Sequence, residues 1–221
     1  MNLSNATIGC TCVGNLLKMH SVVPQDFYRQ ADVVRLAREL LGKSLYTSDK
    51  GIITGGIIIE TEAYAGVTDK ASHAFGNRFT ERTRIMYRDG GCAYVYLCYG
   101  IHSLFNIVTN VEGIPHAVLI RGILPTVGID VMLERRGVTK MGLNFCTGPG
   151  KVSKSFGIHY SHSGLLLTAS PTDNIEMKIW LEEGDRIIKE NEIVSSSRIG
   201  VDYAEEDALL PYRFELKRKT F

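Results

Sequence analysis

The sequence predicts a single α+β domain built around a mostly antiparallel sheet. Its 221 residues, 44% of them apolar and 22% charged, suit one sizeable globular domain with a buried core. Strand-like segments follow one another through short turns and do not alternate regularly with long helices, which argues against a doubly wound parallel sheet. The chain has no internal repeat, no low-complexity linker, and no apolar stretch long enough to span a membrane.

The first predicted elements are a helix and a hairpin. Apolar residues recur at helical spacing over 33–41, Asp32 precedes them as a suitable N-cap, and Gly42 supplies the stop. Strands are expected at 44–48 and 52–59, joined by the turn sequence Asp49-Lys50-Gly51. The pair Gly55-Gly56 within the second strand predicts a bulge or a bend.

The remaining elements are mostly short. The polar, glycine-containing stretch 65–91 predicts loops around short helices. Strands follow at 92–99, 104–109 and 116–123, and helices at 127–136 and 151–156. Beyond residue 160 the pattern predicts short strands between acidic loops, with a last strand at 212–216.

Two carboxylates and a phenol follow a very apolar run of isoleucines. Side chains at i, i+2 and i+4 of an extended chain share a face, so Glu60, Glu62 and Tyr64 are expected to align. Adjacent carboxylates at the rim of a core are costly unless they are paired or used. One of them could have a raised pKa and take a proton from water. The alternative is a salt-bridged strand end with no chemical role.

Three tyrosines occur within six residues before a glycine turn. Tyr94 and Tyr96 share one face of the predicted strand, and Tyr99 is expected on the other face, just before Gly100. An aromatic ring at the tip of a hairpin would be exposed and could act as a wedge in a nucleic-acid stack. The alternative is that these rings are ordinary strand aromatics that cover a core.

Charge is distributed unevenly along a chain whose net charge is only +1. Residues 71–160 hold 10 basic and 5 acidic side chains, whereas residues 161–216 hold 5 basic and 12 acidic ones. The basic segment can form one positive face on a near-neutral protein, unless folding mixes the charges evenly.

Basic side chains within this segment could contact phosphates. Arg78, Arg82 and Arg84 are the candidates in the loop, although neighbouring acidic residues could pair with some of them. The sequence Gly148-Pro149-Gly150-Lys151 lacks the spacing of a nucleotide phosphate loop. It still places free N–H groups and Lys151 at a predicted helix start, where a backbone phosphate could dock.

The five cysteines are odd in number and widely scattered, which favours a reducing compartment over a disulfide framework. Cys10 and Cys12 lack the spacing and the further ligands of a zinc site. Residues 1–23 read as a non-secreted extension of unknown role, so the domain is expected over 24–221. No metal and no cofactor are expected.

Seven blocks of this sequence stand in the order seen in one enzyme family. The chain resembles the alkyladenine (3-methyladenine) DNA glycosylase family over residues 24–217, nearly the whole domain. The blocks are Ile59-Glu60-Thr61-Glu62-Ala63-Tyr64, Ala71-Ser72-His73, Tyr94-Val95-Tyr96-Leu97-Cys98-Tyr99-Gly100, Phe105-Asn106-Ile107, Val118-Leu119-Ile120-Arg121, Thr147-Gly148-Pro149-Gly150-Lys151 and Ser197-Arg198-Ile199-Gly200-Val201.

The resemblance implies a curved antiparallel sheet flanked by helices, with a protruding β-hairpin, and a role for each matching residue. Glu62 would be the general base that activates water, and Arg121 would hold Glu62 and that water, or a nearby phosphate. Tyr99 would fill the gap left in the duplex. The pocket around the extruded base would be formed by Tyr64, His73 and Tyr96 as walls, Asn106 as floor, and the backbone near Val201. Asp202 departs from the small residue expected next.

The implied activity is excision of alkylated or deaminated purines from double-stranded DNA by a monofunctional, monomeric enzyme. Base flipping would bring the purine to Glu62. The location would be cytoplasmic and nucleoid-associated in a bacterium, or nuclear in a eukaryote. Two other functions stay open on the sequence: a non-catalytic nucleic-acid-binding module, and a carbohydrate glycosidase that uses Glu60 and Glu62 together.

Overall fold

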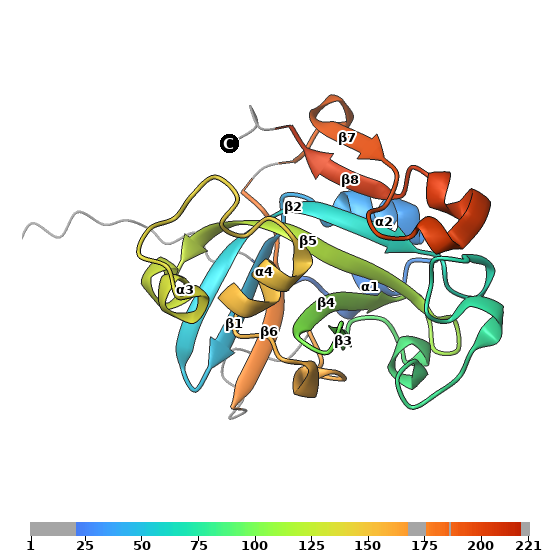
Figure 1. The fold of residues 1–221 in the computed structure, drawn as a ribbon, viewed down its shortest axis with the longest axis horizontal. Coiled ribbons are helices and arrows are strands. Elements are labelled where there is room, and N and C mark those ends of the chain that lie inside the picture. Colours follow the sequence, from blue (N-terminus) through green and yellow to red (C-terminus); the bar gives the residue numbers. More distant parts are fainter. Residues whose placement is uncertain (1–20, 168–175, 186, 218–221) are drawn as a thin grey trace, which may run out of the picture.

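The computed structural model describes residues 21–167, 176–185 and 187–217. Its described strands form one antiparallel sheet in the order β3-β4-β5-β2-β1-β6, with β8 added beside β2 and β7 beside β8. This path curls, as Figure 1 shows. The strands are β1 (Ser44–Asp49), β2 (Ile52–Tyr64), β3 (Ala93–Cys98), β4 (His102–Thr109), β5 (His116–Val127), β6 (Met177–Glu182), β7 (Ile193–Ser196) and β8 (Arg213–Leu216).

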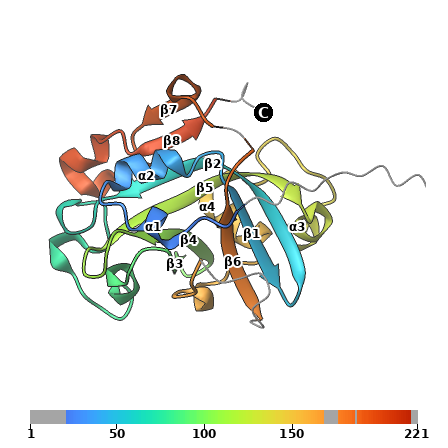
Figure 2. The same cartoon turned by 180° about the vertical axis from the view of Figure 1, so that it is seen from behind.

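Short helices cover both faces of the sheet. Helix α2 packs against β2 and β5 on the face toward the viewer in Figure 2, whereas α4, with α3 beside it, packs against β4 and β5 on the face seen in Figure 1. The α-helices are α1 (Gln25–Tyr28), α2 (Val33–Glu39), α3 (Ile129–Arg136) and α4 (Pro149–Ser155). The 3₁₀ helices are η1 (Gly66–Thr68), η2 (Phe75–Asn77), η3 (Arg84–Tyr87), η4 (Tyr160–His162), η5 (Glu190–Glu192) and η6 (Asp202–Leu209).

Strand β2 pairs with three other strands of the sheet. Its first half pairs with β1, its end pairs with β8, and β5 runs along its other edge. The register against β5 shifts at Gly55/Gly56, which confirms the predicted bulge, and shifts again around Glu60. Thr61 Oγ1 donates to the Ala37 carbonyl of α2, so Glu60 and Glu62 face the opposite side of the sheet.

Helix α2 forms where the sequence predicts it. The Asp32 side chain accepts a hydrogen bond from the Arg35 N–H and so satisfies one of the free donors of the first turn. Leu36 and Ala37 are completely buried against the sheet. The chain leaves the helix through Gly42, whose φ of +84° favours glycine.

The α+β class and the antiparallel sheet are confirmed, while several elements differ from the prediction in their bounds or their presence. Strand β5 continues to Val127 because residues 124–127 pair with the bulged part of β2, so α3 begins at Ile129 and not at 127. Helix α1 was not expected, and its four residues are too few for a periodic pattern. The acidic stretch expected as a loop contains η6.

The N-terminal segment already contacts the sheet before residue 24. Val22 forms a bridge with Glu182, and Val23 is fully buried and donates its N–H to the Leu181 carbonyl at 2.9 Å. Cys10, Cys12 and the rest of residues 1–20 lie outside the described residues. The boundary at 23/24 stays a prediction.

None of the helices in the described ranges combines the length and the apolar character that crossing a membrane requires. Within residues 21–167, 176–185 and 187–217, His, Cys, Asp and Glu side chains form no group of three or more with metal-binding geometry. The free thiols of Cys92 and Cys146 are buried, and that of Cys98 is partly exposed.

Candidate active site

A cavity of about 210 Å³ opens where the β3–β4 hairpin, the end of β2, strand β5 and the segment before η6 meet. Its walls come from residues 64–121 and from residues 199–203, which the fold brings together. Seven of the site residues predicted from the sequence line it: Tyr64, His73, Tyr96, Tyr99, Asn106, Arg121 and Val201.

Glu62 lies directly behind this wall and is fully buried. Its Oε1 accepts the backbone N–H of Ile199 at 2.9 Å and lies 3.3 Å from Nε of Arg121. Its Oε2 accepts a hydrogen bond from the hydroxyl of Tyr64 at 2.8 Å. Three of the groups that line or border the cavity therefore fix one carboxylate.

Glu60 occupies a different environment from Glu62. Its Oε1 lies between two guanidinium groups, with Nε of Arg121 at 3.1 Å and Nε of Arg213 at 2.6 Å. Both buried carboxylates thus have guanidinium partners, as the cost of unpaired buried charge requires, and the partly exposed Arg213 also pairs with Glu215. Glu60 packs against Gly122, where a Cβ would lie 2.9 Å from that of Glu60, so this strand position favours glycine.

Burial raises the pKa of Glu62 above its ordinary value. The Arg121 guanidinium, the Ile199 N–H and the Tyr64 hydroxyl each act in the opposite direction, because they stabilise the carboxylate. The Glu60 carboxylate adds a smaller upward effect on the Glu62 pKa. The side chain is thus a shielded carboxylate with an elevated pKa and charged partners, which is typical of a catalytic base.

Aromatic side chains form one side of the cavity and hold one another. The His73 and Tyr96 rings meet edge to face, with centroids 4.6 Å apart, and His73 Nδ1 lies 2.9 Å from the Tyr94 hydroxyl. Arg82 donates to His73 Nε2 at 3.1 Å, so Nδ1 carries the proton of the neutral ring. Burial, with Arg82 and Arg78 nearby, lowers the pKa of His73 to about 4.

Asn106 is fixed in the wall of the cavity by its own amide. Its Nδ2 donates to the carbonyl oxygens of Tyr94 at 3.1 Å and Leu104 at 3.2 Å, and the residue is almost completely buried. These bonds tie the side chain to strands β3 and β4, so it cannot swing out of the cavity without breaking both.

Tyr99 lies at the tip of the β3–β4 hairpin and is 91% exposed. Strand pairing ends at Cys98 and His102, and the turn between them has a left-handed φ at Tyr99 (+51°) and Gly100 (+71°). Because Tyr99 lies in the turn, strand alternation no longer sets its direction. It lines the same cavity as Tyr94 and Tyr96, so the expectation of opposite faces is wrong.

The four predicted phosphate contacts differ in their surroundings. Arg78 and Lys151 are exposed, the latter with Nζ 3.3 Å from the Asn144 carbonyl. Arg84 pairs with Glu81 at 3.0 Å. The guanidinium of Arg82 lies 4.8 Å from the centroid of the Tyr96 ring and supports the cavity wall. None of these contacts tests a phosphate role, which stays a prediction.

Sequence reasoning missed several residues of the site. Tyr203 lines the cavity, and its hydroxyl donates to the Ala71 carbonyl at 3.1 Å. The acidic sequence around Tyr203 contains no pattern that predicts a place in a binding site. Ile199 and Arg198 fall within a block that carried the family resemblance, yet only Val201 received a role there. Asp202, which departs from the expected small residue, is exposed and begins η6.

Comparison with known proteins identifies relatives of the chain. The family model described as methylpurine-DNA glycosylase (MPG) matches residues 26–220, which include every predicted site residue. A Chlamydia felis protein, named as a proposed 3-methyladenine DNA glycosylase, is 45% identical over 90% of this chain and 97% of its own length. Proteins of the same name are 39% identical in Bacillus cereus, over 90% and 97%, and 38% identical in Clostridium perfringens, over 89% and 96%.

Proposed function

Because the chain belongs to the methylpurine-DNA glycosylase family, we propose that it removes 3-methyladenine and related damaged purines from double-stranded DNA through a water activated by Glu62. The chain is a DNA glycosylase, a base-excision repair enzyme that hydrolyses N-glycosyl bonds. The observation that carries the proposed mechanism is a buried, multiply held carboxylate directly behind an aromatic cavity.

Binding in this cavity requires the purine to leave the duplex, since a stacked base is out of reach. Alkylation makes many purines cationic, and a cation is attracted to the faces of Tyr64 and Tyr96. His73 is neutral at physiological pH because its pKa is about 4, so it adds no positive charge that would repel such a base. Asn106 would crowd the exocyclic amino group of normal guanine.

Glu62 would position and deprotonate the attacking water. An ionised carboxylate offers about four acceptor positions, and the contacts to Ile199, Arg121 and Tyr64 use about three of them. Arg121 borders both Glu62 and the cavity, and the backbone at Val201 would help to hold the water. A cationic purine leaves the sugar readily, so one base suffices without a strong acid.

The structural setting of Glu60 favours a single catalytic carboxylate over the two-carboxylate alternative. Neither carboxylate lines the cavity itself, but Glu62 is held by three residues that do, whereas Glu60 reaches it only through Arg121 and is otherwise held by Arg213. No lysine is found among the lining residues in the described part of the chain, so we propose hydrolysis without strand cleavage. Tyr99 would occupy the gap in the duplex, as an exposed ring beside the cavity mouth can.

A base-release assay tests the proposal. The protein is incubated with alkylated duplex DNA, and with duplexes that carry hypoxanthine or ethenoadenine, and free bases are separated and quantified. We expect release of 3-methyladenine with the sugar–phosphate strand intact. Absence of any free base, from a protein whose melting curve shows a folded domain, would refute the proposed function.

A further inference from the structure

We infer that the buried ion pair between Arg198 and Asp69 positions Glu62 and Tyr64 for the reaction. The inference rests on the proposed role of Glu62 and adds a pair of positioning residues that do not touch the reacting atoms. It follows from three sets of contacts, which link the end of β2, the loop through η1 and the segment that enters η6.

The pair itself is closed to solvent and bidentate. The Arg198 side chain is completely buried and that of Asp69 is 2% exposed. Nη1 of Arg198 donates to Oδ2 of Asp69 at 2.5 Å, and Nη2 donates to Oδ1 at 2.8 Å. Two parallel charge-assisted bonds fix the plane of the guanidinium as well as its position.

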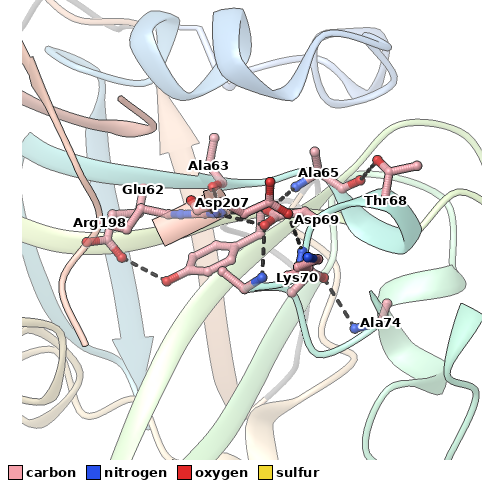
Figure 3. Close-up of polar contacts among 12 residues, drawn as sticks. Glu62, Ala63, Ala65, Thr68, Asp69, Lys70, Ala74, Arg198 and Asp207 are labelled. Carbon is pink, nitrogen blue, oxygen red and sulfur yellow. Dashed lines mark hydrogen bonds and ion pairs between the residues drawn. The ribbon is translucent and has the colours of Figure 1, made fainter. Parts of the chain in front are cut away.

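This guanidinium plane holds the backbone between the two site residues. Nη1 of Arg198 also donates to the Ala63 carbonyl, which lies between Glu62 and Tyr64, at 2.9 Å. Asp69 accepts the N–H groups of Ala65 at 2.9 Å and Ala71 at 3.0 Å. Figure 3 shows Asp69 at the centre of these contacts. The Asp69 carboxylate thus fixes the backbone conformation of the loop that runs from Tyr64 to His73.

Arg198 also fixes the position of the backbone N–H that donates to Glu62. Ile199 is the next residue along the chain, and its N–H donates to Oε1 of Glu62. Nη2 of Arg198 reaches the Asp207 carbonyl at 3.1 Å, and Asp207 Oδ2 accepts the Lys70 N–H at 2.8 Å. The segment that carries Ile199 is therefore bound to the loop after η1 twice, through the Arg198–Asp69 pair and through the contact between Asp207 and Lys70.

Arg198 also supports Tyr64 directly. Its guanidinium carbon lies 4.8 Å from the centroid of the Tyr64 ring, a cation–π distance, and the Tyr64 hydroxyl donates to Glu62. Asp69 balances the charge, so the pair adds no net positive charge beside a cavity proposed to receive a cationic base. Loss of the pair would loosen two of the three groups that hold the Glu62 carboxylate.

This arrangement predicts a pH signature that a merely structural pair would not have. Release of the Ile199 and Tyr64 donors removes two contacts that lower the pKa of Glu62, so that pKa should rise. A base must be ionised, so the acid limb of the rate profile should move to higher pH. The ionisable groups around Glu62 are Glu60 and Tyr64 of β2, Arg121 of β5, Arg213 of β8, Arg198 and Tyr203.

The test is single-turnover base release by Arg198→Lys as a function of pH. Lysine keeps the charge but cannot bridge both Asp69 oxygens and also reach Ala63 and Asp207. We expect a rate at neutral pH lower by about tenfold or more, an acid limb shifted upward by about half a pH unit, and affinity for a lesion duplex within about threefold. Asp69→Asn, which keeps the shape but not the charge, should also lower the rate at neutral pH. Its acid limb should move less than that of Arg198→Lys, because the Arg198 charge left unbalanced stabilises the Glu62 carboxylate.

Arg135→Lys is the matched control, because Arg135 is a partly buried arginine that pairs with Asp49 at 3.4 Å, away from the cavity. A wild-type rate and acid limb in Arg198→Lys would overturn the inference. So would a rate loss that Arg135→Lys reproduces at an equal loss of melting temperature. Glu62→Gln is measured in parallel: if that variant is fully active, the proposed role of Glu62 fails, and this outcome is distinct from failure of the ion pair alone.

Discussion

At the scale of single residues, burial and pairing act on Glu62 in opposite directions, and the balance decides its chemistry. Complete burial disfavours the carboxylate, whereas Arg121, the Ile199 N–H and the Tyr64 hydroxyl favour it. The residue is then a carboxyl group with a raised pKa, held by three partners that stabilise its ionised form and shielded from bulk water. Glu60, two positions earlier, is held by Arg121 and Arg213.

Glu62→Gln should therefore lose base release by at least about a hundredfold, the usual scale for a general base, and keep its affinity for DNA. Glutamine keeps acceptor and volume but cannot take a proton. Glu60→Gln should lose less activity and show its effect mainly as a lower melting temperature, because it removes the buried charge that Arg121 and Arg213 share and leaves them paired only with Glu62 and Glu215. Equal activity losses in both variants would restore the two-carboxylate reading. Single-turnover rates and melting curves provide the comparison.

The elevated pKa of Glu62 also predicts the shape of the rate profile. As the pH falls through that pKa, the carboxylate is protonated and the rate should decline, at a pH above the ordinary range of a glutamate. His73 has its pKa lowered to about 4 and stays neutral through this range. His73→Phe should consequently leave the acid limb in place even if the rate changes. A limb that moves with His73 would contradict the assignment.

At the scale of elements, the β3–β4 hairpin presents an apolar tip in which Leu97, Tyr99 and Ile101 are exposed. Such exposure of large side chains beside a cavity is unusual without a partner. The left-handed turn at Tyr99 and Gly100 points this ring toward the cavity mouth and not along the strand face.

Tyr99→Ser should barely change the melting temperature. The ring is 91% exposed, so the substitution removes little buried apolar area. It should weaken binding to lesion duplexes, because nothing then occupies the space left by the flipped base. The loss should be smaller when the lesion lies opposite a mismatch, where extrusion is easier. Ile187→Ser, which also truncates a highly exposed side chain but lies away from the cavity, is the control. A large stability loss with context-independent binding would make Tyr99 a core residue.

Local signals predicted the elements that depend on neighbours in sequence. The Asp32 cap, the Gly55-Gly56 bulge and the alignment of Glu60, Glu62 and Tyr64 all follow from spacing of a few residues. The Arg198–Asp69 pair joins residues 129 positions apart, and Tyr203 reaches Ala71 across a similar separation. Such contacts depend on how β8 and η6 pack beside β2, which spacing does not encode. The family resemblance predicted which residues line the cavity, but it assigned no role to Arg198, Asp69 or Tyr203.

At the scale of the whole molecule, the basic side chains of residues 71–160 lie in different surroundings: some are at the cavity, one is paired on the surface, and others are exposed. Arg121 and Arg82 are engaged at the cavity, Arg84 pairs with an exposed Glu81, and Arg78 and Lys151 are exposed. The near-zero net charge of the chain therefore conceals exposed cations, Arg78 and Lys151, for which we propose contacts with a phosphate backbone.

This division predicts how DNA affinity depends on salt. Each lost phosphate contact should lower the slope of log affinity against log salt by about one unit, and we expect this for Arg78→Ala and Lys151→Ala with little change in the rate of base release. Arg84→Ala should have a smaller effect, because Glu81 already screens its charge. Arg82→Ala should in addition slow base release, since Arg82 holds His73 and covers the Tyr96 ring.

Arg35→Ala serves as the control for these variants, because Arg35 is exposed on α2, on the face of the sheet opposite Glu60 and Glu62. Titrations at several salt concentrations on one lesion duplex give each slope. If all four slopes equal that of Arg35→Ala, the loop arginines and Lys151 form a solvated face, and the backbone must be held elsewhere. If only Arg82→Ala changes the slope, the phosphates approach directly over the His73–Tyr96 wall, and the DNA path is narrower than the charge pattern predicts.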